Sequence, residues 1–158
     1  DTGEDTLTGG RLARVKQYLD EEPFFFTYGD GLSNINLIEL LQHHKNEGKK
    51  ATLTAVQPPG RYGALEIKRE NEVDFFKEKP DGDGSWINGG FFVLEPSVID
   101  LIEGDLCTWE QEPLKKLAQD GELNAFNHKG FWQPMDTLRD KNNLERLWAE
   151  GHAPWKTW

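Results

Sequence analysis

The segment FFFTYGDG places one carboxylate, Asp30, between Gly29 and Gly31 at the end of an apolar run. The run Phe24–Thr27 predicts a buried strand, and ligands of open α/β sheets bind beyond the carboxyl ends of their strands. Flanking glycines permit a tight turn and the close approach of a ligand. A carboxylate in this position suits Mg²⁺, which takes few protein carboxylates together with phosphate oxygens. The alternative is that Asp30 caps the next helix or forms an ordinary Asp-Gly turn.

A second carboxylate, Asp136, lies in QPMDT directly before an expected helix. It is a candidate partner of Asp30 for the metal, provided that the fold brings the two loops to one sheet edge. The alternative is that Asp136 is the N-cap of the helix, where Asp is preferred. Thr137 and Asp140 compete for that capping role because their spacing matches a capping box.

Two further motifs carry groups suited to a sugar phosphate. Glu78 and Lys79 end an expected strand, and a lysine there offers a compact cation for a phosphate. Asn88 and Gly89 precede another expected strand and could present amide donors to hydroxyl groups. The alternatives are an ordinary solvated lysine and a plain turn.

A calcium site is a weaker interpretation of the sequence DGDG, residues 81–84. An EF-hand loop requires a Glu at its twelfth position, where this chain has Phe92, and flanking helices are not expected here. We interpret this segment as an acidic turn.

The composition predicts a single soluble domain and excludes several classes of protein. The net charge of −10 over 158 residues argues against a broad nucleic-acid surface, which needs clustered Lys and Arg. The single cysteine, Cys107, excludes a disulfide within the chain. Apolar runs are too short to span a membrane, so we expect a cytoplasmic protein. The six tryptophans must be buried or used at contacts, and we expect a homo-oligomer.

Hydrophobic periodicity and turn signals alternate between strands and helices along residues 1–158, which predicts one α/β domain. We expect a Rossmann-like mixed, mostly parallel sheet with flanking helices and a small antiparallel addition from the strands between residues 64 and 94, which lack intervening helices. Helices are predicted at 12–19, 37–47, 96–102, 112–119 and 137–150. Strands are predicted at 24–27, 51–56, 64–67, 73–78, 90–94 and 123–127.

Seven segments follow one another in an order that resembles a known family. They are TGGRLARV, FFFTYGDG, KKATLTAVQPPGRYGALEI, FFKEKPDGDG, INGGFFVLEPSVIDLI, TWEQEPLKKLA and GFWQPMDTLRDKNNLERLW. Together they look like the sugar-nucleotide pyrophosphorylases, which are sugar nucleotidyltransferases, over essentially the whole chain. The segments GFWQPMDTLRDK and PPGRYGALEI resemble the cytidylyl branch more than the thymidylyl or uridylyl branches.

The resemblance implies a reaction and a role for each matching residue. The reaction would be the Mg²⁺-dependent transfer of a cytidylyl group from CTP to α-D-glucose 1-phosphate, which gives CDP-glucose and pyrophosphate for deoxysugar and O-antigen precursors. Asp30 and Asp136 would be the metal ligands, with Lys79 on the sugar phosphate and Glu78 on the sugar hydroxyls. The remaining residues implied to bind substrate are Gly63, Asn88 and Gly89 in the sugar pocket, Tyr28 beside the metal, and Gly10 and Arg11 on the nucleotide side.

Members of the family begin with a strand and a glycine-rich loop that cradles the nucleotide phosphates, and this sequence contains neither. We therefore expect a rear portion of such an enzyme that is inactive alone, with an apolar strand edge at 24–27. Three alternatives remain: a sugar-phosphate-binding fragment, a related uridylyl or thymidylyl transferase, and an unrelated α/β domain.

Overall fold

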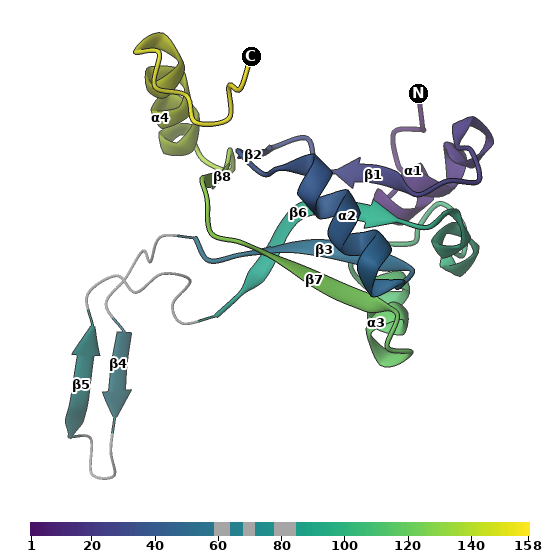
Figure 1. Ribbon diagram of the computed structural model, residues 1–158, viewed down its shortest axis with the longest axis horizontal. Coiled ribbons are helices and arrows are strands. Elements are labelled where there is room, and N and C mark those ends of the chain that lie inside the picture. The colour runs from purple at the N-terminus through teal and green to yellow at the C-terminus, as the bar shows by residue number, and fades with distance from the viewer. Residues whose placement is uncertain (59–63, 68–71, 78–84) are drawn as a thin grey trace. The chain divides into compact units, whose positions relative to one another are not determined.

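A computed structural model describes residues 1–58, 64–67, 72–77 and 85–158 of the chain (Figure 1). The chain divides into two compact units, each built from several segments. The first unit comprises residues 1–28, 36–54 and 90–126, and the second comprises 29–35, 55–89 and 127–158. Among the described residues, no helix combines the length and the apolar character needed to cross a membrane.

The main sheet has four strands in the order β1-β6-β3-β7, which are β1 (Phe24–Thr27), β6 (Ile87–Leu94), β3 (Ala51–Val56) and β7 (Leu123–His128). β1 and β6 are antiparallel. The Glu95 amide after β6 donates to the Lys50 carbonyl before β3, whereas Ala51 at the start of β3 donates to Glu122 just before β7. The first bond joins the end of β6 to the start of β3, which is typical of antiparallel strands. The second joins the starts of β3 and β7, which is typical of parallel strands (Figure 1).

The expected mixed α/β class is confirmed, but parallel pairing does not dominate among the described strands. β6 is antiparallel to both of its neighbours, β1 and β3. A parallel pair would need a crossover connection, usually a helix, between the two strands.

The strand predicted at 24–27 is present and lies at a sheet edge, as expected, but it is only partly buried. β1 lies at the edge of the four-stranded sheet, and its residues alternate between half-buried and exposed. Phe24 and Phe26 pack against the core, whereas Phe25 is 47% exposed. A strand covered on one face only must alternate in this way, so three consecutive phenylalanines do not indicate burial of all three.

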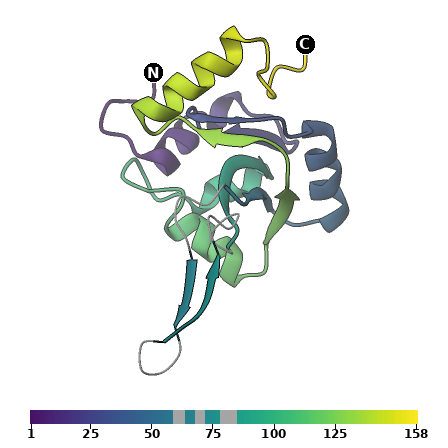
Figure 2. The ribbon, with the colours of Figure 1, turned by 90° about the vertical axis from the view of Figure 1, so that its left-hand side faces the viewer.

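The two faces of β3 pack against different helices. Ala51 and Leu53 contact the core cluster that contains Leu12, Phe92 and Trp109. On the alternate positions of the strand, Thr52 lies 2.9 Å from Nδ1 of buried His44 in α2 (Leu37–Glu47). Figures 1 and 2 show α2 alongside the strands β3 and β7. Helices therefore cover both faces of the sheet, as expected for an α/β arrangement.

The other helices are α1 (Thr8–Arg14), the short 3₁₀ helices η1 (Lys16–Tyr18) and η4 (Pro96–Leu101), α3 (Glu112–Gln119) and α4 (Leu138–Ala149). α2 ends as predicted at Gly48, whose φ of +61° is the left-handed conformation that glycine adopts without strain. The predicted helix at 12–19 begins four residues earlier, as α1.

Two small antiparallel sheets belong to the second unit. β4 (Ala64–Ile67) pairs with β5 (Val73–Lys77), which confirms the expected antiparallel addition. β2 (Gly31–Ser33) pairs with β8 (Trp132–Pro134). The sequence did not predict the β2–β8 pair, because strands of three residues are too short to show a period of two.

α1 begins early because its two glycines pack directly on the backbone of a loop. The amides of Leu7 and Gly9 donate to the carbonyls of Asp105 and Cys107 at 2.9 and 3.0 Å. A Cβ atom at Gly10 would lie 2.3 Å from the Asp105 carbonyl oxygen, so only glycine fits this approach. The glycines that look like helix breakers in the sequence therefore allow the helix to pack.

We predict that Gly10→Ala destabilises the protein by about 1–3 kcal/mol, because the new methyl group meets immovable backbone. Gly29→Ala is the matched control, since no atom lies within 4 Å of the Cβ position there. Its effect should stay within about 0.5 kcal/mol. Chemical unfolding of the two variants measures the difference, and equal stabilities would contradict the close packing of α1.

Candidate functional site

The β2–β8 ladder brings the segments of the two candidate metal ligands together. Its register pairs Gly31 with Pro134 and Ser33 with Trp132. One step beyond the paired strands, the Met135 amide donates to the Asp30 carbonyl at 2.8 Å. Asp136 follows Met135 directly, so the backbones of the two aspartates are near neighbours within one compact unit.

Neither aspartate caps a helix, although Asp30 does lie in a turn, as its other alternative interpretation predicted. At α2, the side chain of Asn36 accepts from the amides of Ile38 and Glu39 at 3.0 and 3.3 Å. At α4, Thr137 and Asp140 form a reciprocal capping box. The two helix N-termini are therefore satisfied by other side chains, and the carboxylates of Asp30 and Asp136 are not needed there.

Both carboxylates are exposed, and neither forms a hydrogen bond or ion pair with another described residue. The described part of the chain also gathers no group of three or more His, Cys, Asp or Glu side chains that could hold a metal. Two carboxylates without a third protein ligand fit Mg²⁺, which completes its coordination with water and substrate phosphate. They do not fit a closed structural metal site, which needs a full set of protein ligands.

The Asn88-Gly89 motif lies inside β6, whereas the sequence predicted that it precedes the strand. β6 begins at Ile87, and the Gly89 carbonyl accepts a 2.7 Å hydrogen bond from Nε1 of Trp132. Gly90, the next residue, has φ of +77°. Trp132 therefore links β8 to the Asn-Gly segment within the second unit. Hydrophobic periodicity in the sequence cannot predict such a contact, because the two residues are far apart along the chain.

Tyr28 is held in the first unit by three kinds of contact. Its amide donates to the Gly90 carbonyl at 2.9 Å, and a Cβ at Gly90 would come within 2.7 Å of the tyrosine ring. Its hydroxyl donates to Oε1 of Glu110 at 2.5 Å, and the other oxygen of Glu110 accepts from Thr8 at 2.8 Å. Sequence reasoning did not identify Thr8 or Glu110, although both lie in segments that carried the family resemblance.

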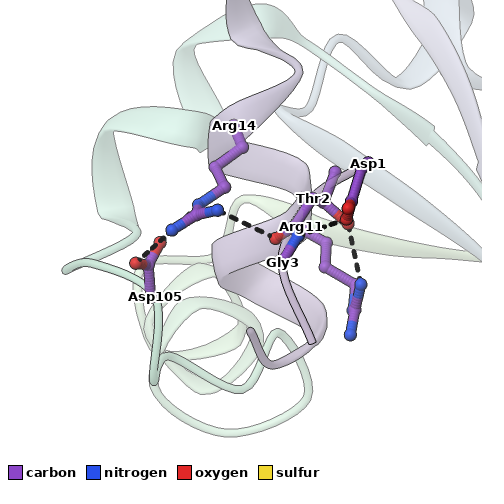
Figure 3. Close-up of polar contacts among 6 residues, drawn as sticks. All are labelled: Asp1, Thr2, Gly3, Arg11, Arg14 and Asp105. Carbon is purple, nitrogen blue, oxygen red and sulfur yellow. Dashed lines mark hydrogen bonds and ion pairs between the residues drawn. The ribbon is translucent and has the colours of Figure 1, made fainter. Parts of the chain in front are cut away.

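Arg11 has structural partners near the N-terminus of the chain, and Gly10 packs on the loop that contains Asp105 (Figure 3 shows Arg11 and Asp105). The guanidinium of Arg11 donates to the hydroxyl of Thr2 at 2.8 Å and to the carbonyl of Glu4 at 3.1 Å. Gly10 is buried in the packing of α1. A role on the nucleotide side stays a prediction for both residues.

A neighbouring arginine, Arg14, also ties α1 to the loop beneath it (Figure 3). It donates to both carboxylate oxygens of Asp105, at 2.8 and 2.6 Å. This hydrogen bonding holds the pKa of Asp105 below its ordinary value and raises that of Arg14. The pair fixes the loop against which Gly10 packs.

Three predicted substrate residues, Gly63, Glu78 and Lys79, lie outside the described residues.

The sequence profile of the family described as "Nucleotidyl transferase" matches residues 5–139. The chain belongs to the nucleotidyl transferase family. It is 64% identical over its whole length to the glucose-1-phosphate cytidylyltransferase of Salmonella typhimurium and 44% identical to the probable glucose-1-phosphate cytidylyltransferase of Bacillus subtilis. It spans 62% of the length of each of these relatives. A probable mannose-1-phosphate guanylyltransferase from rice is 36% identical over 90% of this chain and 42% of its own.

Solved structures show that this nucleotidyl transferase chain shares its fold with related proteins. HddC from Yersinia pseudotuberculosis has a TM-score of 0.66 at 22% identity over 89% of this chain and 62% of its own. A UDP-glucose pyrophosphorylase complexed with UDP-glucose has the same TM-score at 13% identity over 95% of this chain and 64% of its own. At such identities the likeness concerns the fold alone.

We predict that removing the carboxylate of Asp136 leaves the stability of this nucleotidyl transferase chain nearly unchanged, because α4 is capped by Thr137 and Asp140. Asp136→Asn should stay within about 0.5 kcal/mol of the parent. Thr137→Ala, which removes the N-cap hydroxyl, should cost about 1 kcal/mol. Thermal unfolding of both variants makes the comparison, and a larger loss for Asp136→Asn would show that Asp136 has a structural role.

Proposed function

We propose that this chain forms the sugar-phosphate- and metal-binding part of a glucose-1-phosphate cytidylyltransferase. The reaction would convert CTP and α-D-glucose 1-phosphate to CDP-glucose and pyrophosphate. The proposal is carried by the β2–β8 pairing, which brings together two aspartate segments whose carboxylates have no structural partner in the described part of the chain. The choice of substrates is supported by 64% identity over the whole chain to relatives named for this activity.

The chemistry needs positioning and charge neutralisation more than a reactive side chain. An oxygen of the sugar phosphate attacks the α-phosphorus of CTP in line. A new phosphorus–oxygen bond forms as the bond to pyrophosphate breaks. The nucleophile is already an anion, so no covalent enzyme intermediate is required. Because both reactants are polyanions, catalysis rests on holding them in line and offsetting their repulsion.

Asp30 and Asp136 would hold the Mg²⁺, which when bound supplies positive charge for the phosphoryl oxygens. The two carboxylates would reach the ion from adjacent backbone segments. The ammonium of Lys79 would bind the sugar phosphate, and Glu78 would accept hydrogen bonds from sugar hydroxyls. A sugar lacking those hydroxyls would leave the Glu78 carboxylate unpaired, which is a strong source of discrimination.

The other substrate contacts that we propose come from several segments of the chain. Asn88 and Gly89 in β6, together with Gly63, would line the sugar pocket. Tyr28 would stand beside the metal, with Gly10 and Arg11 towards the nucleotide. A homo-oligomeric state and a cytoplasmic location stay predictions from the sequence.

The competing proposal is a sugar-phosphate-binding chain that takes no part in nucleotidyl transfer. It differs from the first proposal in one respect: it would bind glucose 1-phosphate but would not support turnover in any context. The relatives offer a direct way to distinguish the two, because this chain matches 62% of their length at high identity.

We predict that the chain alone releases no pyrophosphate from CTP and glucose 1-phosphate in Mg²⁺, because the glycine-rich loop that the family uses for the nucleotide phosphates is not among its residues. A chimera in which the chain replaces the matching part of the Salmonella typhimurium relative should make CDP-glucose. Pyrophosphate release and product chromatography provide the two readouts. An inactive but folded chimera would contradict the transferase proposal, and robust turnover by the chain alone would contradict the need for a separate nucleotide loop.

We predict that Asp30→Asn or Asp136→Asn lowers kcat of this chimera by about a hundredfold or more, because several kcal/mol of charge stabilisation are lost. Calorimetric titration of Mg²⁺ in the presence of glucose 1-phosphate should show weaker metal binding for both variants. Asp5→Asn is the control, since Asp5 is an exposed aspartate outside the site. Unchanged metal binding in Asp30→Asn would refute the ligand assignment.

A further inference from the structure

A continuous polar network joins two motifs of the first unit through one carboxylate. Glu110 accepts from the Tyr28 hydroxyl at 2.5 Å and from the Thr8 hydroxyl at 2.8 Å, one on each carboxylate oxygen. Thr8 in turn accepts from the amide of Trp109 at 3.0 Å. Glu110 therefore bridges the start of the Thr-Gly-Gly-Arg segment and the start of the Tyr-Gly-Asp segment.

The bond between Tyr28 and Glu110 is of the strong kind. A hydroxyl that donates to an ionised carboxylate forms a shorter and stronger bond than a neutral pair. Glu110 and Tyr28 are both half-buried, so water competes less for this bond than on an open surface. The hydroxyl of Tyr28 is therefore engaged by Glu110 within the first unit.

Aromatic contacts hold the ring of Tyr28, whereas its hydroxyl is held by Glu110. The ring lies 6.0 Å from that of Phe26 and 5.7 Å from that of Phe92, centroid to centroid. These contacts and the Gly90 approach hold the ring against the core. Glu110 is the charged group that anchors the polar end of the side chain, and it is itself tied to α1 through Thr8.

We propose that Glu110 is a positioning residue for the nucleotidyl transfer, acting through Tyr28 and Thr8 without touching the substrates. The inference rests on the proposed function. Tyr28 precedes Asp30 by two residues, so the anchored tyrosine restrains the chain that leads to the candidate metal ligand. A displacement of catalytic groups by about an ångström can cost a hundredfold in rate, which is why such an anchor affects turnover.

A purely structural role for the network predicts a different outcome. In that case the loss of the hydrogen bonds would lower the unfolding temperature, and kcat of the folded enzyme would not change. A positioning role predicts a lower kcat well below the unfolding temperature, with little change in KM, because geometry during the reaction is affected more than substrate binding.

The test uses the active chimera and a graded series of substitutions. Glu110→Ala removes both acceptors, Glu110→Gln keeps one acceptor oxygen, and Tyr28→Phe removes only the hydroxyl. Thr8→Val removes the second donor, whereas Thr8→Ser keeps it. The matched controls are Tyr18→Phe and Glu112→Gln, which alter an exposed tyrosine and an exposed glutamate.

We expect Tyr28→Phe to lower kcat about tenfold, which corresponds to the loss of one charge-assisted hydrogen bond, and Glu110→Ala, which removes two, to lower it at least as much. Glu110→Gln should be intermediate, Thr8→Ser should restore what Thr8→Val loses, and the controls should match the parent. The double variant of Tyr28 and Glu110 should be no worse than the more impaired single variant, since both remove the same bond.

Unchanged kcat in Tyr28→Phe and Glu110→Ala, or losses that simply multiply in the double variant, would overturn the role of Glu110 while leaving the transferase proposal intact. An inactive but folded parent chimera would contradict the transferase proposal and this role with it. A fall in unfolding temperature without a fall in kcat would identify the network as structural.

Discussion

The pairing of two very short strands, β2 and β8, is the constraint on which the candidate site depends. Each strand has three residues, and each comes from a different part of the chain. Their antiparallel ladder continues through the bond from the Met135 amide to the Asp30 carbonyl. Backbone hydrogen bonds set this register irrespective of side chains, so two aspartates that are distant in sequence become neighbours without any attraction between them.

The backbones of Asp30 and Asp136 lie close together, and two carboxylates that shared one site would repel each other unless a cation lay between them. The caps of α2 and α4 show that neither aspartate is placed there to satisfy a helix N-terminus. Asn36 caps α2, and Thr137 with Asp140 caps α4, so the aspartates at 30 and 136 are not needed as caps. The aspartates and glutamates of the two candidate motifs and of the helix contacts described above differ in their partners. Asp105, Glu110 and Asp140 hold elements together, whereas Asp30 and Asp136 have no partner among the described side chains.

Close backbone approach is the second device that this fold uses repeatedly. Gly10 lets α1 lie against the Asp105 carbonyl, and Gly90 lets the Tyr28 ring lie against β6. Added methyl groups at either position would overlap fixed atoms. In both cases a glycine next to a motif residue is explained by a neighbour that is far away in the sequence. The same glycines, seen as part of a linear sequence, are typical of turns and helix breaks.

The sequence by itself determined the alternation of helices and strands, the end of α2 at Gly48 and the family. These features depend on residues within a few positions of one another, or on order along the chain. Only the tertiary structure decided that Phe25 of β1 is exposed, that α1 includes its two glycines, and that Glu110 joins Thr8 to Tyr28. It also brought the segments of Asp30 and Asp136 together. Each of these depends on contacts across long stretches of chain, and neither periodicity nor propensity contains information about which distant segments meet.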